Sequence, residues 1–389
     1  MPQTTDIGVR LREVRKRRGL SQRELAAAAG VSISLIRKLE QGQVTDTRME
    51  TARRLAVPLG VPTTQLLSRD AEPADTPTAN QWEPVRRALA APLPTPGGDA
   101  PTIASITETM RIARVLRENG RFAELATVLP ALLSDSDTLV GTGAAARRVR
   151  VQALQLTAWL LTQTCQYDAA NMALERALAD ATDLLDSAAT INAQCWLLLR
   201  QGRLEQTREL AIRWADEIEP RWSRANPAEL YAWGWMMIRI SAAAVRDGQE
   251  SEASDALRMA HSAAVMLGRE YASKADYPRT FGPMKVARQR AEHAAVADRP
   301  DRVLRLAATL PKGPPTNTTR RYLLDVADAH AKTRNPGQAM SILREIQAVS
   351  PEWLLTQRYA RDIVSRLIGK RRTLTPEMRA LADAVGVPL

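Results

Sequence analysis

Cysteine, histidine and aromatic residues are scarce in this chain of 389 residues. It contains two cysteines, Cys165 and Cys195, three histidines and an aromatic content of only 4%. Two cysteines cannot build a disulfide-rich scaffold, so we expect free thiols and a cytoplasmic location. His261, His293 and His330 lack the spacing of metal ligands, so we expect neither a metal site nor a cofactor.

Long apolar runs and catalytic motifs are also missing. No segment approaches the roughly 18 consecutive apolar residues of a membrane-spanning helix, and the N-terminus has no apolar signal-peptide core. We therefore expect no contact with a membrane. The sequence contains no nucleophile elbow, no P-loop and no dinucleotide-binding glycine motif. These absences predict a protein that is not an enzyme.

The residues that are abundant favour helices. Alanine, leucine and arginine are frequent, whereas only two phenylalanines and six tyrosines occur. Unbranched side chains favour helices, and β-branched and aromatic side chains favour strands. The composition therefore predicts an all-α fold, and the length predicts more than one domain.

Positive charge is concentrated near the N-terminus. The chain carries a net charge of +11, and residues 1–69 contain thirteen Lys and Arg but only six Asp and Glu. The first sixth of the chain thus holds +7 of the net charge. Such a concentration is typical of a module that binds nucleic-acid phosphates.

Residues 21–42 have the pattern of two short helices joined by a tight turn. Ser21 and Glu24 match a capping box, which begins the first helix, and Gly30 ends it. Ser32 is a suitable N-cap for the second helix. Two helices joined by a glycine turn at this spacing are typical of the helix-turn-helix unit, whose second helix enters the DNA major groove.

The surrounding sequence resembles the Xre/Cro-type helix-turn-helix domain. The signature R-x-x-RGLSQ-x-ELA-x-x-AGVS-x-x-x-I-x-x-LE-x-G, followed by LA-x-x-LGV, covers roughly residues 6–68. The resemblance implies a domain of five helices that binds double-stranded DNA. Lys38 would contact guanine, Ile33 a thymine methyl group, and Arg48 a phosphate. The full set of predicted DNA-binding residues is Ser21, Gln22, Ser32, Ile33, Ser34, Arg37, Lys38 and Arg48.

The chain after this domain divides into a linker and a long helical region. Residues 69–101 are rich in proline and glycine, which predicts a linker, with a short helix around residues 82–91. The predicted domains are therefore residues 1–68 and 102–389. Within the second, small residues recur where two helices of a hairpin would cross, at Ala113, Ala158, Cys195, Ser241, Ala291 and Ala327.

This recurrence resembles tetratricopeptide repeats. The resemblance implies a superhelix of helical hairpins whose first helices line a concave surface. Gln155 with Trp159, and Asn192 with Trp196, occupy equivalent positions on that surface. An amide beside an aromatic ring suits an extended peptide. The predicted ligand-binding residues are Gln155, Trp159, Asn192, Trp196, Trp235, Lys285, Arg288 and Arg321.

The three cations in that set favour an acidic side chain or a C-terminal carboxylate. The alternative is that the tryptophans belong to an ordinary helical core. Residues 268–286 interrupt the hairpins, and we expect a plain loop there, with the border of a ligand site as the alternative.

Together, the two halves resemble the RRNPP-type regulators of quorum sensing. The resemblance implies a cytoplasmic homodimer, a palindromic DNA operator and a signalling peptide that controls transcription. Three alternatives stay open from the sequence alone: the repeats bind a small-molecule effector, they bind a partner protein, or they serve only dimerisation.

Overall fold

The computed structural model describes most of the chain, with short gaps. The described residues are 7–17, 20–44, 47, 49–59, 63, 66, 81–93, 101–276, 279–311, 313–314, 316–369 and 374–387. Apart from one pair of two-residue strands, every regular element in these ranges is a helix. The predicted all-α fold is confirmed. None of these helices combines the length and the apolar character that crossing a membrane requires.

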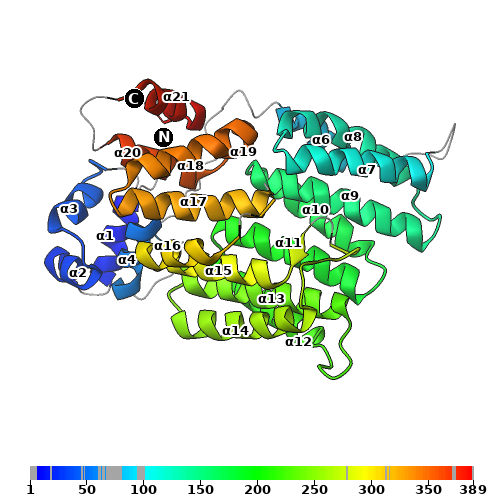
Figure 1. The fold of residues 1–389 in the computed structure, drawn as a ribbon, viewed down its shortest axis with the longest axis horizontal. Helices are drawn as coiled ribbons and strands as arrows, with labels where there is room; N and C mark the ends of the chain where they lie inside the picture. The colour runs from blue at the N-terminus through cyan, green and yellow to red at the C-terminus, as the bar shows by residue number, and fades with distance from the viewer. Residues whose placement is uncertain are drawn as a thin grey trace.

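A small helical bundle lies at one end of the molecule (Figure 1). Its helices are α1 (Ile7–Arg17), α2 (Gln22–Ala29), α3 (Ile33–Glu40) and α4 (Met49–Leu59). The centre of the bundle consists of fully buried apolar side chains, among them Leu11, Leu25, Ile36, Leu39 and Leu55. The fifth helix expected from the sequence falls largely outside the described residues.

Six consecutive helical hairpins make up most of the remaining described chain. The pairs are α7 (Ile103–Glu118) with α8 (Phe122–Thr138), α9 (Ala144–Gln163) with α10 (Tyr167–Ala179), α11 (Leu184–Gln201) with α12 (Leu204–Glu217), α13 (Pro227–Arg246) with α14 (Glu250–Leu267), α15 (Pro283–Val296) with α16 (Pro300–Thr309), and α17 (Asn317–Lys332) with α18 (Pro336–Val349). Three short helices follow: α19 (Pro351–Leu355), α20 (Arg358–Ile368) and α21 (Pro376–Val385).

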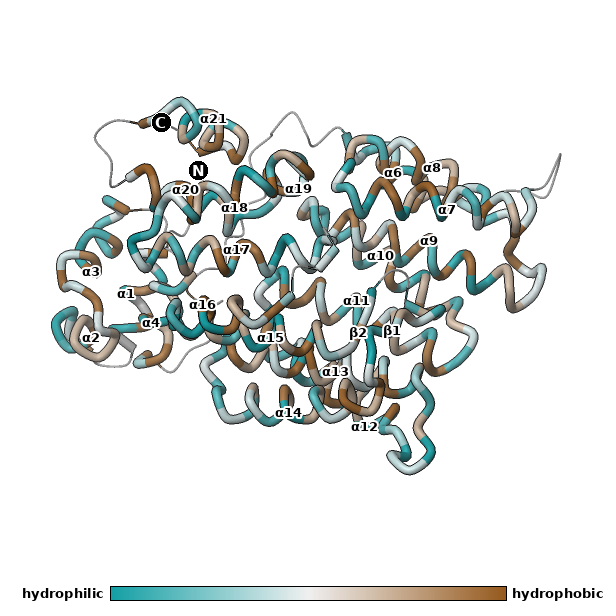
Figure 2. Tube along the Cα trace, in the orientation of Figure 1, coloured by the Kyte–Doolittle hydropathy of each residue, from teal (hydrophilic) through white to brown (hydrophobic). Residues whose placement is uncertain are grey.

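Each hairpin packs against the next, and the small residues predicted at the crossings lie inside. All six of them are at most 1% exposed. Small side chains are needed there because the two helices of a hairpin approach closely. Hydrophobic and hydrophilic residues alternate along these helices (Figure 2), as expected for helices that bury one face.

The proline-rich segment after the bundle contains helix α6 (Glu83–Ala90). This helix packs against α8 and α10 and buries Trp82, Val85 and Leu89. Arg176 Nη1 donates to the carbonyl oxygen of Leu89 at 2.8 Å. This bond gives a partner to one of the C-terminal carbonyl groups of α6, which have none within the helix. Residues 81–93 are therefore packed onto the first hairpins.

The array of hairpins closes on itself. Arg320 Nη2, on α17, donates to the carbonyl oxygen of Glu118 at 2.6 Å, and Ser350 Oγ donates to that of Asn119 at 2.9 Å. These bonds satisfy the C-terminal carbonyl groups of α7, which have no partner within that helix. The last hairpin thus contacts the first directly.

Residues 268–286 are not the plain loop expected from the sequence. They contain strands β1 (Tyr271–Ala272) and β2 (Thr280–Phe281), which pair antiparallel with Tyr271 opposite Phe281. Phe281 is fully buried against α13, where a Cβ atom on Gly234 would lie 2.2 Å from its ring. Because glycine leaves this space open, the base of the strand hairpin can pack on the backbone of α13.

Helix α4 joins the bundle to the hairpins. Lys332 Nζ, at the end of α17, lies 3.2 Å from Glu50 Oε2. Arg53 donates to the carbonyl oxygen of Val296, the last residue of α15, and lies 3.9 Å from Glu250 at the start of α14. The bundle therefore rests on the ends of three neighbouring hairpins.

Candidate functional site

Capping side chains fix the start of α2 and α3. Ser21 Oγ accepts a hydrogen bond from the Glu24 N–H at 3.2 Å, and the Glu24 carboxylate accepts one from the Ser21 N–H at 2.7 Å. Ser32 Oγ accepts from the Leu35 N–H at 3.2 Å. These bonds satisfy backbone donors that have no partner within their own helix. Both helices begin where the capping pattern predicts.

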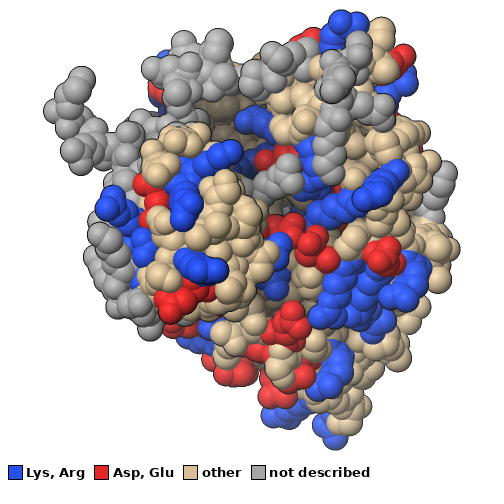
Figure 3. Space-filling model, turned by 90° about the vertical axis from the view of Figure 1, so that its left-hand side faces the viewer, with Lys and Arg blue, Asp and Glu red and all other residues tan. Residues whose placement is uncertain are grey.

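One face of α3 points away from the core of the bundle. Ser34, Arg37 and Lys38 are exposed, and their spacing of three and four residues places them on the same side of the helix. Helix α3 lies at the outer edge of the molecule (Figure 1). Figure 3 looks onto this end, where Lys and Arg side chains lie among Asp and Glu. Two cations beside a hydroxyl group can contact base edges and phosphates.

Glu40, at the end of α3, connects three helices. Its carboxylate accepts from Arg15 Nε and Nη2 at 2.6 and 2.8 Å and from Gln22 Nε2 at 2.7 Å. Burial alone would raise the pKa of Glu40, but these hydrogen bonds outweigh it and lower the pKa below its ordinary value. The network holds α3 against α1 and α2.

A close backbone approach supports the same contact. A Cβ atom on Gly8 of α1 would lie 1.8 Å from the carbonyl oxygen of Leu39 on α3. Any side chain at this position would push the two helices apart. The exposed face of α3 is therefore presented by a helix with a fixed position.

A second group of side chains lies along the first helices of the hairpins. Trp159 stacks on Trp196 with ring centroids 6.4 Å apart, and Phe122 meets Trp159 edge-on at 5.6 Å. The guanidinium carbon of Arg117 lies 5.1 Å from the centroid of Trp159, and that of Arg279 lies 6.0 Å from Trp196. Neighbouring hairpins thus build a row of aromatic rings, covered by cations at favourable distances.

Trp235 lies between two cations. The guanidinium carbon of Arg239 is 5.0 Å from its ring centroid, and Lys285 Nζ is 5.2 Å away. Burial lowers the pKa of Lys285 to about 8, although the Glu292 carboxylate acts against this shift. Lys285 Nζ donates to Gln289 Oε1 at 2.8 Å, and the Gln289 amide nitrogen is buried without a partner among the described residues. This nitrogen is a buried donor that no described residue uses.

Cations outnumber carboxylates beside Trp235. Glu292 pairs with Arg246, and Asp325 pairs with Arg321 at 2.8 Å. Burial raises the pKa of Asp325 to about 6, with Arg321 opposing the shift. Arg288 lies over the ring of Tyr322 at 5.8 Å. The resulting excess of positive charge suits an anionic group.

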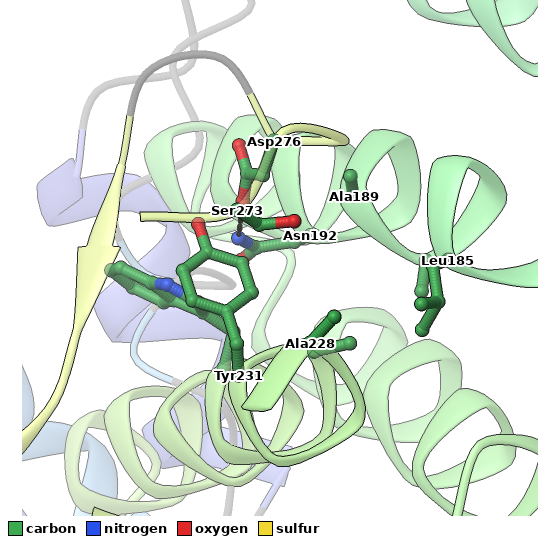
Figure 4. Close-up of a pocket in the computed structure, with 10 residues that line it drawn as sticks. Leu185, Ala189, Asn192, Ala228, Tyr231, Ser273 and Asp276 are labelled. Atoms are coloured by element: carbon green, nitrogen blue, oxygen red, sulfur yellow. Dashed lines mark hydrogen bonds between the residues drawn. The ribbon is translucent and has the colours of Figure 1, made fainter. Parts of the chain in front are cut away.

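The β1–β2 hairpin brings one carboxylate of the chain to this surface. Asp276 Oδ2 accepts from Asn192 Nδ2 at 2.9 Å, and its Oδ1 accepts from Arg279 Nη1 at 2.7 Å. Asn192 Oδ1 in turn accepts from Arg239 Nε at 2.7 Å. Figure 4 shows Asp276, Asn192 and Tyr231 around a small cleft. The cleft measures about 10 Å³, enough for one water molecule at most.

Comparison with known proteins identifies the first of these two sites. Residues 6–68 match the family model described as a helix-turn-helix domain. The N-terminal bundle is a helix-turn-helix domain. Domains of this kind bind DNA through the second helix of the unit, which is α3 in this chain. The DNA-binding part of the resemblance drawn from the sequence is confirmed.

Two solved structures are similar to the chain at low identity. One is Bacillus thuringiensis PlcR in complex with the peptide PapR7 and DNA, with 14% identity, a TM-score of 0.37, and coverage of 85% of this chain and 98% of that one. The other is the apo form of ComR from S. thermophilus, with 12% identity, a TM-score of 0.26, and coverage of 94% and 99%. No curated protein matches the chain. Both TM-scores lie below 0.5.

The helix-turn-helix domain exposes five of the eight predicted DNA-binding residues, namely Ser21, Ser32, Ser34, Arg37 and Lys38. Ile33 is half-buried against the domain core, and the Gln22 amide is held by Glu40. Arg48 lies outside the described residues. The role of Glu40 was missed, although this residue belongs to the helix-turn-helix signature. A charged residue at a position that packs between helices is the signal that could have indicated it.

The structure places the predicted ligand-binding residues in separate groups, and Trp159 and Trp235 lie in the core of the hairpins, at 6% and 5% exposed. Trp159 stacks on Trp196, Trp235 lies beside Lys285, and Asn192 lies below the strand hairpin. Gln155 is only 1% exposed and donates to Thr190 Oγ1 at 3.1 Å, so its amide is already paired. Arg288 and Arg321 lie over the rings of Tyr322 and Tyr359. Arg239 and Asp276 were missed, because no local pattern marks them.

Proposed function

We propose that this chain is a sequence-specific DNA-binding transcriptional regulator whose repeat part senses an anionic peptide. In this proposal, residues 1–68 bind DNA, residues 69–101 link the two parts, and residues 102–389 form tetratricopeptide-like repeats that bind the ligand and dimerise. The protein acts in the cytoplasm as a homodimer on a palindromic operator. The two half-sites then lie about 10 bp apart, one turn of the double helix.

The observation that carries the sensing proposal is the mixture of groups along the first helices of the hairpins. The half-buried ring of Trp196 supplies apolar contact area, and the amide nitrogen of Gln289, which has no partner among the described residues, supplies a donor for a peptide carbonyl group. The excess of cations beside Trp235 favours a carboxylate. A small apolar effector would not use these charges, and a surface used only for dimerisation would not need them.

The same helices connect this surface to the helix-turn-helix domain. Helix α15 carries Lys285 near its start and ends at Val296, whose carbonyl oxygen accepts from Arg53. Helix α17 carries Arg321 near its start and ends at Lys332, which pairs with Glu50. A ligand that moves either helix therefore acts on α4 without an intermediate element. This arrangement supports regulation of DNA binding by the ligand.

Lys38→Ala is expected to weaken binding to the preferred operator by about 1–3 kcal/mol and to relax the preference at one base pair. The exposed ammonium group can donate to guanine O6 and N7, which only one base pair presents in this way. Selection of bound genomic fragments first defines the operator. Titration of wild-type and variant protein with labelled operator and random duplexes then measures both effects.

Arg48→Ala serves as the comparison, because the loss of a phosphate contact weakens binding to all DNA sequences alike. If Lys38→Ala lowers affinity equally for the operator and for random DNA, Lys38 does not read a base. If no genomic fragment is enriched over random DNA, the proposal of sequence-specific binding fails.

Peptides with a free C-terminal carboxylate are expected to change the fluorescence of the chain more than the same peptides with an amidated C-terminus. Trp196 is half-buried and stacks on Trp159, which like Trp235 is buried in the core of the hairpins, so a ligand at the proposed surface alters their emission. Pools of synthetic heptapeptides in both forms are titrated into the full chain, with Lys285→Gln as a variant that weakens the response. Operator affinity is measured with each pool. A chain that responds in neither assay to peptides or to culture extract would not be a peptide sensor.

A further inference from the structure

Asp276 places a carboxylate inside the proposed ligand surface. It is only 1% exposed, although it lies on the β1–β2 hairpin, outside the helical pairs. A buried carboxylate is costly unless its oxygens are hydrogen-bonded. Asn192 and Arg279 provide those bonds at 2.9 and 2.7 Å. The site is therefore built to hold a carboxylate.

Arg239 contributes a buried cation beside Asn192. It is 7% exposed, donates Nε to Asn192 Oδ1, and lies over Trp235. No carboxylate of the described residues forms an ion pair with its guanidinium group. Burial and the charge of nearby Arg279 together lower the pKa of Arg239 to about 9, while Asp276 acts in the opposite direction. Asp276 therefore pairs with half-buried Arg279, and buried Arg239 is linked to this carboxylate through Asn192.

The strand hairpin that carries Asp276 is held in place by contacts other than those of the carboxylate. Phe281 anchors the base of the hairpin on α13. Nearer to Asp276, Gln152 Nε2 donates to the Lys274 carbonyl oxygen at 2.6 Å, and Tyr231 Oη donates to that of Arg279 at 3.3 Å. Both of these are single hydrogen bonds, each worth about 1 kcal/mol net. The carboxylate can leave its site while the anchored base stays in place.

We propose that Asn192 and Arg239 form a binding site for a carboxylate of the peptide ligand, and that Asp276 occupies this site when no ligand is bound. The inference rests on the proposed function, because it names the chemistry of the group that the sensing surface takes. The cleft beside Asp276 has room for only about one water molecule, so a ligand carboxylate must replace Asp276 rather than bind next to it. Ala189, Ala228 and Leu185 line the cleft and favour a small apolar neighbour of that carboxylate.

The chain itself supplies the probe for a test. The heptapeptide Ser-Lys-Ala-Asp-Tyr-Pro-Arg has the sequence of residues 273–279, and its analogue with Asn in place of Asp lacks only the charge. Both peptides are titrated into the full chain carrying Asp276→Ala, with tryptophan fluorescence and calorimetry as readouts. We expect the Asp peptide to bind the variant at least about tenfold more tightly than the Asn peptide, and about tenfold more tightly than it binds the wild type, as for the loss of one charge-assisted hydrogen bond.

Three further variants make the outcome decisive. Asp276→Asn keeps the size of the side chain and guards against misfolding, and we expect a smaller gain in affinity than for Asp276→Ala. Asp276→Ala combined with Arg239→Met should bind both peptides alike. Asp255→Ala removes an exposed carboxylate on α14 and should behave as the wild type. Circular dichroism verifies that each chain is folded.

Equal binding of the two peptides by folded Asp276→Ala would overturn the carboxylate site, and so would the absence of any binding. Neither result touches the proposed function, which is tested separately by the operator selection and by the response to peptide pools. Conversely, if the chain discriminates between the two heptapeptides but shows no operator preference, the carboxylate site stands and the proposal of a transcriptional regulator fails.

Discussion

Replacing Trp353 by alanine is expected to lower the free energy of unfolding of the repeat part by about 3–5 kcal/mol. Trp353 is only 1% exposed and is among the largest fully buried side chains of the described chain. It lies on α19, next to the turn between α7 and α8, where a Cβ on Gly120 would lie 3.3 Å from its own Cβ. Truncation removes a large apolar contact and leaves a cavity where the array closes. Urea unfolding followed by circular dichroism measures the loss.

Leu355→Ala is the matched control for this prediction. Leu355 is on the same short helix but 40% exposed, so its truncation should cost less than about 1 kcal/mol. If both variants unfold at the same urea concentration, the contact between the last and the first hairpin does not stabilise the fold.

Glu40→Ala is expected to destabilise the helix-turn-helix domain by about 3 kcal/mol and to weaken binding to all DNA sequences. The side chains of Glu40 and Arg15 are 3% and 9% exposed, so removing the carboxylate leaves a buried guanidinium group without its partner. Helix α3 then loses its hold on α1 and α2. Hydrogen exchange of amides in residues 20–44 of the full chain reports the local stability.

The same carboxylate predicts a dependence on pH. The pKa of Glu40 in the folded domain lies below its ordinary value of 4.5. A group with a lowered pKa contributes its full stabilisation above the unfolded value and loses it as the pH falls through the folded one. Protection of these amides should therefore decrease below about pH 4.5 in the wild type. Glu40→Gln should remove this part of the pH dependence, and an unchanged profile would show that Glu40 is not its source.

Local features of the sequence predicted local features of the structure. Ser21, Gly30 and Ser32 end or begin helices because capping depends on residues only a few positions apart. The small residues at the hairpin crossings were found by their recurrence, since closely packed helices require them at fixed offsets. The helix around residues 82–91 likewise followed from its own composition.

Contacts between distant residues were beyond such reasoning. Asn192 and Asp276 are 84 positions apart, and nothing near either residue indicates the other. The strand hairpin could not be foreseen, because its anchor depends on the space above Gly234 on another helix. The resemblance predicts a DNA contact for Ile33, and in the structure this side chain is half-buried against the domain core. The periodicity of apolar residues indicates that one face of a helix is buried, but it does not indicate which element packs against that face.

The contact between the two ends of the hairpin array also affects how the chain is made. The backbone N–H of Ala123 donates to Glu352 Oε2 at 2.8 Å, across 229 positions. At about 5–20 residues per second, a ribosome needs roughly 10 to 50 s to synthesise the chain between these two residues. During that time the first hairpin is outside the ribosome without the helix that covers its turn. A helix made late in synthesis is therefore required to complete the first hairpin, and a product truncated before α19 would leave that hairpin exposed to chaperones and proteases.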